Sequence, residues 1–189
     1  MTKNIILLGL PGVGKGTQAE LIVKDFNLPH ISTGEIFREA MANETALGVE
    51  AKNFIDKGEL VPDSITNGIV HERLDENDVV AAQGFLLDGF PRNVDQADDL
   101  KNYLNSKNQK VDAVIYLAAD DQTVIDRMMG RGRADDTQEV VEKRIEVAKE
   151  QTMPLVDYYQ AENTLVEISA LASVEEIYQS VNQAINELN

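Results

Sequence analysis

Short apolar runs recur along the chain, and most are followed by a stretch with the spacing of an amphipathic helix. Consecutive apolar residues, rather than alternating ones, are typical of strands that are buried on both faces of a parallel sheet. The pattern therefore predicts an α/β fold, a five-stranded parallel sheet with helices on both faces. The predicted strands are residues 4–8, 28–32, 84–88, 111–117 and 164–168.

Polar residues at the ends of the helical stretches predict where several helices begin. Ser32 and Glu35 have the spacing of a capping box, in which a hydroxyl and a carboxylate satisfy the first backbone N–H groups. Asp63 and Asp136 are expected to cap the helices that follow them. Residues 75–83 are predicted to form a polar loop.

A glycine-rich turn, residues 9–17, joins the first predicted strand to the first predicted helix. Its glycines let backbone N–H groups approach an anion, and the helix N-terminus adds partial positive charge. Lys15 can reach terminal phosphates, so the turn has the P-loop pattern. Gly16 stands where Ser or Thr usually follows the lysine, which leaves open whether Thr17 touches magnesium. A glycine-rich turn without a ligand is the alternative, and the strand and lysine together favour nucleotide binding.

The composition limits the other possibilities. A chain of 189 residues, 43% of them hydrophobic, is expected to form one domain. It has no cysteine, which excludes disulfides and thiolate metal sites. We see no signal peptide or membrane span and expect a cytoplasmic protein. The formal charge of -16 argues against a nucleic-acid partner, which would need a basic face.

Arginines offer the means by which an acidic chain could hold polyphosphate. Four of the seven arginines fall between residues 127 and 144, and Arg92 follows a turn that Gly89 and Pro91 define. Guanidinium groups bind phosphate bidentately. A solvated helix face that balances nearby carboxylates is the alternative for any one of them.

An acidic residue, Asp88, ends the third predicted strand, where α/β sheets bind ligands. Beside a P-loop it could hold Mg²⁺, through water. The two histidines, His30 and His71, stand alone in the sequence and are interpreted as structural.

Several motifs together resemble the adenylate kinase family, in its order and spacing and over nearly the whole chain. They are Gly9 to Gln18, Ser32-Thr33-Gly34 with Arg38, Gly58 to Val61, Asp88 to Arg92 with Gln96, and Gly130 to Asp136.

The resemblance implies two nucleotide sites. ATP would bind at Gly12, Val13, Gly14, Lys15, Gly16, Thr17, Arg127, Arg131 and Ala172. AMP would bind at Thr33, Arg38, Glu59, Leu60, Val61, Gly89, Phe90, Pro91, Arg92, Gln96, Arg133 and Arg144. The implied catalytic residues are Lys15, Arg92, Arg127, Arg131, Arg133 and Arg144.

The resemblance also implies moving parts. Residues 32–61 would be an AMP-binding flap and 130–136 a lid, around a core of 1–31, 62–129 and 137–189. Only Gly132 separates Arg131 from Arg133, so the lid looks like the short form of the family. Without cysteines, no lid zinc is expected.

The resemblance implies a monomer that catalyses reversible, Mg²⁺-dependent transfer of the terminal phosphoryl group of ATP to AMP, which gives two ADP.

The nearest alternative is a UMP/CMP kinase, although Thr33 favours AMP because that family tends to carry Ala at this position. A nucleotide-binding regulatory ATPase is an alternative of another class. The second predicted anion site, Thr33 with Arg38 and Arg92, argues against it.

Overall fold

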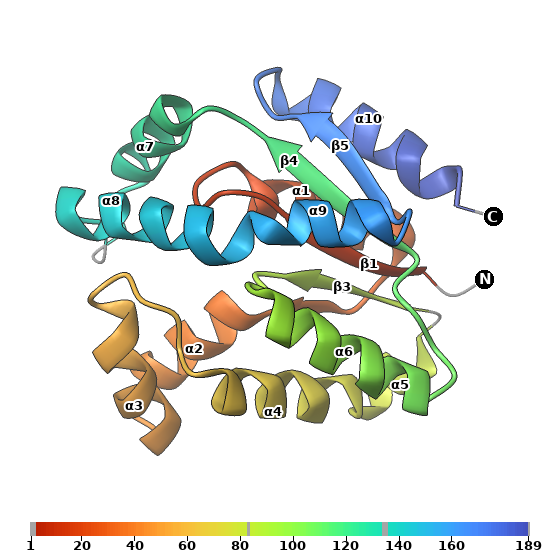
Figure 1. Cartoon of the computed structure of the whole chain (residues 1–189), viewed down its shortest axis with the longest axis horizontal. Helices are drawn as coiled ribbons and strands as arrows, with labels where there is room; N and C mark the ends of the chain where they lie inside the picture. Colours follow the sequence, from red (N-terminus) through yellow and green to blue (C-terminus); the bar gives the residue numbers. More distant parts are fainter. Residues whose placement is uncertain (1–2, 83, 134–135, 189) are drawn as a thin grey trace.

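A five-stranded, all-parallel sheet forms the centre of the computed structural model, which describes residues 3–82, 84–133 and 136–188 (Figure 1). Its strand order is β2-β3-β1-β4-β5, so β1 is central and the chain builds outward to both sides of it. The predicted α/β architecture is thus confirmed. The strands are β1 (Lys3–Leu8), β2 (His30–Ser32), β3 (Gly84–Asp88), β4 (Ala113–Ala118) and β5 (Leu165–Ser169).

Two separate cores cover the two faces of the sheet. Within β1, Ile5 and Leu7 enter one core while Ile6 and Leu8 enter the other, because successive strand residues point to opposite faces. The first core also contains side chains of α1 (Lys15–Phe26), α7 (Asp121–Gly130), α8 (Gln138–Val147) and α10 (Val174–Asn186). The second contains those of α4 (Asp63–Leu74), α5 (Asn77–Ala81), α6 (Val94–Ser106) and α9 (Pro154–Ala161).

The register of the strands brings their carboxyl ends to one edge of the sheet. Asp88 pairs with both Leu7 and Ser32, and Leu8 pairs with Tyr116. The loops that leave β1, β3 and β4 therefore emerge side by side. In open α/β sheets this is the edge where ligands bind.

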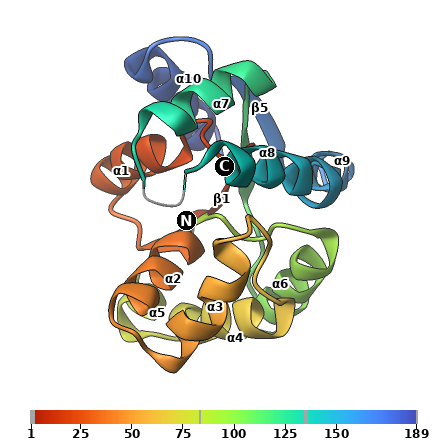
Figure 2. The ribbon, with the colours of Figure 1, turned by 90° about the vertical axis from the view of Figure 1, so that its left-hand side faces the viewer.

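A third, smaller core belongs to the segment expected to be the flap. Helices α2 (Thr33–Ala42) and α3 (Ala46–Ile55) pack through Phe37 and Ala51, and Val61 joins them. These helices lie to one side of the sheet and stand apart from α7 and α10 (Figures 1 and 2). Ile65 and Ile69 of α4 pack against this core, so it joins α2 and α3 to the start of α4.

A π-helical turn, η1 (Ala148–Thr152), joins α8 to α9 into one long rod across the molecule (Figure 1). Its backbone bond from Met153 N to Ala148 O, 2.8 Å, spans five residues. The wider turn ends just before Pro154, which has no N–H to donate to a regular helix. It also presents the Thr152 hydroxyl, which donates to the Arg92 carbonyl at 2.7 Å.

Three of the local predictions are wrong. Residues 75–83 contain the short helix α5, which has one buried side chain and so leaves no periodic pattern. Asp63 is the first residue of α4 rather than its cap, because Pro62 holds the cap position. Thr137, not Asp136, caps α8, since the Asp136 carboxylate pairs with arginines instead.

The predicted cap at Ser32 is confirmed in part. Its hydroxyl accepts from Glu35 N at 3.4 Å. The reciprocal half of the capping box is not formed, because the Glu35 carboxylate lies 3.8 Å from His30 Nδ1.

A matched pair of glycine substitutions tests the packing of the α2–α3 unit. A Cβ at Gly48 would lie 2.0 Å from the Ala40 carbonyl oxygen, whereas one at Gly68, in α4, would meet nothing within 4 Å. We expect Gly48→Ala to lower the free energy of unfolding by about 1–3 kcal/mol through overpacking. Gly68→Ala should raise it by about 0.4–1 kcal/mol, because it restricts the unfolded chain. Urea denaturation measures both, and equal effects would contradict the packing described.

Candidate active site

One large cleft, of about 800 Å³, opens at the carboxyl edge of the sheet. Residues of the loop after β1, of the α2–α3 unit, of the loop after β3 and of the α7–α8 region line it. Figure 2 shows these elements in two groups, α1, α7, α8 and α10 above and α2–α6 below. Segments far apart in the sequence thus meet around a single space.

The glycine-rich turn after β1 has the backbone of an anion cradle. Gly12 and Gly14 have φ angles of +83° and +113°, which other residues rarely adopt. A Cβ at Gly12 would lie 2.4 Å from Met128 Cγ, so the loop needs glycine to pack on α7. Around Gly14 and Gly16 there is open space within 4 Å, and α1 begins at Lys15. The helix N-terminus therefore faces an open cradle that suits a phosphate.

Lys15 folds back over this loop. Its Nζ donates to the carbonyls of Gly9 (2.8 Å) and Leu10 (3.0 Å). Burial lowers the pKa of Lys15 from 10.5 to about 8, Asp88 opposes the shift, and Arg92 and Arg131 add to it. The buried ammonium is therefore only partly stabilised by nearby negative charge, and a bound phosphate would stabilise it further.

The loop after β3 positions Arg92. Its Nε donates to the Gly89 carbonyl at 2.7 Å, and the Thr33 hydroxyl donates to that same oxygen at 2.9 Å. Burial lowers the pKa of Arg92, as do the charges of Arg144 and Arg38, while Asp88 raises it. An anion placed among these guanidinium groups would relieve their mutual repulsion.

Arg127 links the glycine-rich loop to the residue that follows β5 (Leu165–Ser169). Its Nη1 donates to the Val13 carbonyl at 2.9 Å and its Nη2 to the Ala170 carbonyl at 2.8 Å. The same guanidinium lines the cleft. In this arrangement it holds the loop that would carry the phosphates.

A buried carboxylate, Asp136, joins two arginines of the cleft. It accepts from Arg131 Nε at 2.5 Å and Nη2 at 2.8 Å, and from Arg144 Nη1 at 2.9 Å. Its side chain is 1% exposed. Asp136 thus holds both guanidinium groups in place.

The carboxylate expected to serve magnesium, Asp88, lines the cleft at the end of β3, with a side chain 13% exposed. Among the described residues no group of three or more metal-binding side chains occurs. One carboxylate together with the exposed Thr17 hydroxyl suits Mg²⁺, which keeps several waters and takes its other ligands from phosphates. The residues therefore fit an ion that arrives with a nucleotide.

In the structure each of the two histidines lies beside carboxylates. His30 lies between Glu35 and Asp88, with Nε2 3.9 Å from the Asp88 carboxylate. His71 stacks on Tyr103 and lies 2.8 Å from Asp99.

Nearly every predicted site residue lines the cleft. Phe90 does not, because its side chain is fully buried in the second core. The predicted residues that the cleft brings together are Gly12, Val13, Gly14, Lys15, Gly16, Thr17, Thr33, Arg38, Glu59, Leu60, Val61, Asp88, Gly89, Pro91, Arg92, Gln96, Arg127, Arg131, Arg133, Arg144 and Ala172.

Three residues that contact the site were missed. Asp63 accepts a hydrogen bond from Gln96. Asp136 joins Arg131 to Arg144, and Thr152 donates to the Arg92 carbonyl. For Asp136 a signal existed, since it stands among four arginines in the sequence. Asp63 and Thr152 bind partners 33 and 60 residues away, so no local pattern could reveal them.

Residues 7–164 match the family model described as "Adenylate kinase". The chain belongs to the adenylate kinase family. An adenylate kinase of Oenococcus oeni is 59% identical over 188 residues, and the match covers all of both chains. One of Leuconostoc mesenteroides is 49% identical over 189 residues, again covering both chains. One of Bacillus velezensis is 42% identical, over 98% of this chain and 99% of its own, but that alignment extends over 217 residues.

As a member of the adenylate kinase family, the chain is a phosphotransferase, which decides against the regulatory ATPase alternative. The relatives named above are called adenylate kinases, which favours this reading over a UMP/CMP kinase. Within the described ranges, no helix combines the length and the apolar character needed to span a bilayer.

The shifted pKa of Lys15 predicts an alkaline loss of ATP binding in this member of the adenylate kinase family. With a pKa of about 8, free enzyme loses the Lys15 proton as the pH rises through that value, and a neutral amine no longer attracts phosphate. We expect kcat/KM for ATP to fall above pH 8 by up to about tenfold per pH unit. Lys15→Arg, which stays protonated, should be less active but lack this step. Identical pH profiles for the two proteins would contradict the assignment.

Proposed function

We propose that the cleft holds ATP and AMP end to end and that the chain transfers the terminal phosphoryl group of ATP to the AMP phosphate. One observation carries this proposal. In a chain of net charge -16, Lys15 and six of the seven arginines line one cleft. So many cations around one space match the combined negative charge of two nucleotides.

The ATP phosphates would lie in the loop after β1, on residues 12–17, with Arg127 and Arg131 beside them and Ala172 near the base. The open space at Gly14 and Gly16 and the position of Lys15 support this. The AMP site would lie opposite. Thr33, Arg38, the backbone of residues 59–61, the Gly89–Arg92 loop and Gln96 would form it, and Arg133 and Arg144 would lie near its phosphate.

The chemistry requires positioning and charge rather than a base. The bond between the γ-phosphorus and the β–γ bridging oxygen breaks, and a bond forms from an AMP phosphate oxygen to that phosphorus. The attacking oxygen is already anionic, so no proton needs to move. Guanidinium and ammonium groups stabilise the charge on the transferring group, which accounts for most catalysis of this kind.

Magnesium would come with ATP, and Asp88, through water, is the residue proposed to hold it. The ion would neutralise charge on the β- and γ-phosphates. The chain's own residues would orient the magnesium–ATP complex, with Lys15 and Arg92 both in the lining of the cleft.

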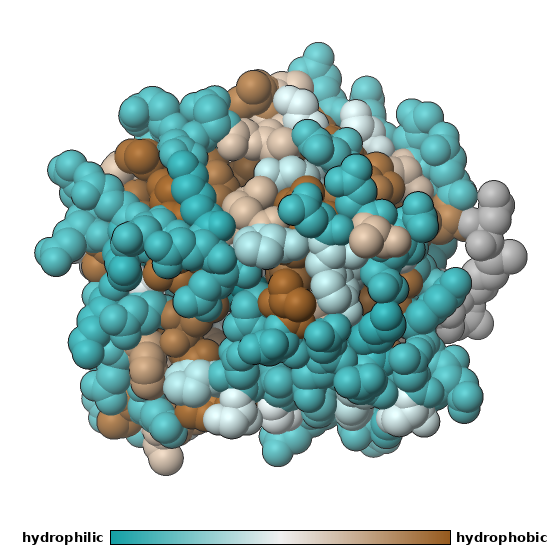
Figure 3. Space-filling model, in the orientation of Figure 1, coloured by the Kyte–Doolittle hydropathy of each residue, from teal (hydrophilic) through white to brown (hydrophobic). Residues whose placement is uncertain are grey.

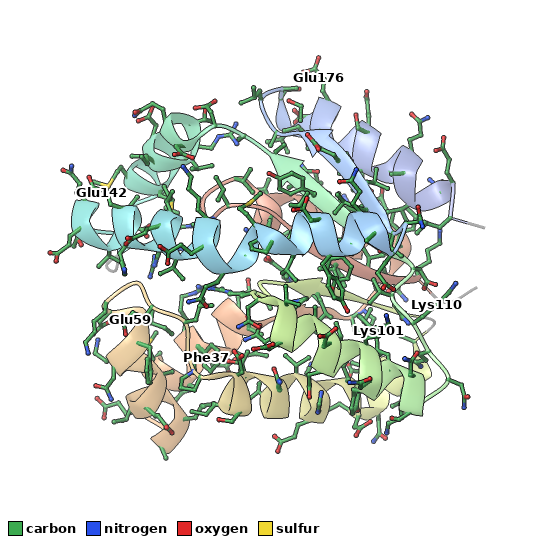
Figure 4. All side chains as sticks on the ribbon, viewed as in Figure 1. Phe37, Glu59, Lys101, Lys110, Glu142 and Glu176 are labelled. Atoms are coloured by element: carbon green, nitrogen blue, oxygen red, sulfur yellow. The ribbon has the colours of Figure 1, made fainter. Side chains whose placement is uncertain are left out.

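Closure would exclude water, which otherwise competes with AMP as acceptor. Residues 32–61, with the core built on Phe37, are the proposed flap, and residues 130–136 the proposed short lid; of the latter, 134 and 135 lie outside the described residues. A Cβ on Gly58 would lie 3.0 Å from Val140 O, so the flap already approaches α8. Figure 4 shows Glu59 on the side of the flap that faces α8, where Glu142 lies.

We further propose a cytoplasmic monomer. The large exposed hydrophobic residues, Val49, Val80, Met129, Leu171 and Val174, come from several elements rather than one face. Most of the face shown in Figure 3 is hydrophilic, with apolar residues in small separate areas. The acidic surface implies no affinity for nucleic acid.

Measuring ADP formation from ATP with AMP, CMP, UMP or GMP as acceptor tests the proposal. We expect rapid transfer to AMP and slow transfer to the others.

Arg92→Ala should lower kcat by about 10³-fold or more, because it removes a positive charge that would stabilise the transferring phosphoryl group. Arg73→Ala is the matched control, since Arg73 pairs with Glu76 and Asp78 outside the cleft, and it should keep near-normal kinetics. Near-normal turnover of Arg92→Ala, or preference for CMP or UMP, would overturn the proposal.

A further inference from the structure

We propose that Asp63 determines acceptor specificity, by locking the Gln96 amide in the orientation that pairs with a 6-aminopurine and rejects a 6-oxopurine. Asp63 would act as a positioning residue, through Gln96. The inference rests on the proposed function, because it requires that Gln96 face the acceptor base.

The Gln96 amide is held at both ends. Its Nε2 donates to Asp63 Oδ1 at 2.7 Å, and its Oε1 accepts from the backbone N–H of Arg92 at 2.7 Å. The residue is 1% exposed yet lines the cleft, whereas Asp63 does not line it. Asp63 therefore lies behind Gln96, where it can orient the amide without touching the ligand.

Neither partner tolerates a flipped amide. A carboxylate only accepts hydrogen bonds and a backbone N–H only donates them. Rotation of the amide by 180° would set Oε1 against the Asp63 carboxylate and the NH₂ group against the Arg92 N–H. Both bonds would be lost and both contacts would become repulsive, so one orientation is fixed before a substrate binds.

Asp63 is itself held in place. Asn93 Nδ2 lies 3.1 Å from each oxygen of the Asp63 carboxylate, and Asn93 Oδ1 accepts from Gln96 N at 2.8 Å. Asn93 therefore caps α6 and supports the carboxylate at the same time. Asp63, Asn93 and Gln96, with the Gln96 backbone N–H closing the set, form a ring of hydrogen bonds between the start of α4 and the start of α6.

The locked amide has one pattern left for a ligand. Nε2 keeps one N–H and Oε1 keeps one lone pair. An adenine presents the complement, an acceptor at N1 and a donor at N6. A hypoxanthine or guanine presents a donor at N1 and an acceptor at O6, the reverse pattern. A free glutamine could flip to suit either base, but this one is prevented from doing so, and an unpaired buried polar group costs much of the affinity.

The test compares AMP with IMP as acceptor in wild type, Asp63→Asn and Asp95→Asn. The amide introduced by Asp63→Asn could present either an oxygen or an NH₂ group to Gln96, so one of the two restraints on the Gln96 amide is removed and only the Arg92 N–H still opposes the flip. We expect the AMP-to-IMP ratio of kcat/KM to fall about tenfold or more in Asp63→Asn, mainly through KM. Asp95→Asn removes the same charge from an exposed position in the first turn of α6 and should leave the ratio unchanged.

A double-mutant cycle separates action through Gln96 from a general effect on the fold. In a Gln96→Ala background, the Asp63→Asn change should no longer alter the AMP-to-IMP ratio. An equal effect in both backgrounds, or an unchanged ratio in the single variant, would overturn the proposal. A wild type that forms no ADP from ATP and AMP would instead overturn the proposed function.

A measurement on the unaltered protein covers the case in which Asp63→Asn does not fold. By ¹⁵N NMR, one of the two Gln96 Nε2 protons should be protected from exchange with solvent, because it is bonded to Asp63. Rapid exchange with solvent of both protons would overturn the lock.

Discussion

The rest of the structure depends on holding many cations close together in a protein that is strongly acidic elsewhere. Like charges at short range repel, and burial raises the cost of each. The chain offsets this cost with its own oxygen atoms. Lys15 and Arg127 donate to backbone carbonyls, and Asp136 joins Arg131 to Arg144. These bonds hold the guanidinium and ammonium groups at the cleft, so the protein itself fixes much of the site.

The fold supplies the place for this arrangement. Strands β1 and β3 are paired neighbours in the parallel sheet, so their carboxyl ends lie together. The glycine-rich loop and the Arg92 loop, which follow these strands, are therefore adjacent. The rod of α8, η1 and α9 then crosses from one core to the other, and its π turn brings Thr152 to the Arg92 backbone. Helices α2 and α3 pack around the small third core, and α2 carries Thr33 and Arg38 to the cleft. The sheet, the α8–α9 rod and the two helices α2 and α3 thus all contribute to one cleft.

Much of this could be predicted from the sequence, because the information is local. Strands β1, β3 and β4 contain continuous apolar runs, and the glycine-lysine spacing of the first loop is distinctive. The contacts that could not be predicted join residues that lie far apart in the sequence. Asp63 and Asp136 have the appearance of helix caps, yet their carboxylates serve Gln96 and two arginines. Phe90 stands in a site motif, but its side chain is fully buried, since the loop turns it into the core.

The central claim is that the cations form one continuous site for two nucleotides, and a two-headed ligand tests it most directly. Such a ligand joins two adenosines through a chain of phosphates, so it fills both halves only if they face each other. By isothermal titration calorimetry we expect one molecule to bind per chain, about 10²-fold or more tighter than ATP or AMP, and to exclude both. Two molecules per chain, or an affinity no better than that of ATP alone, would contradict the account.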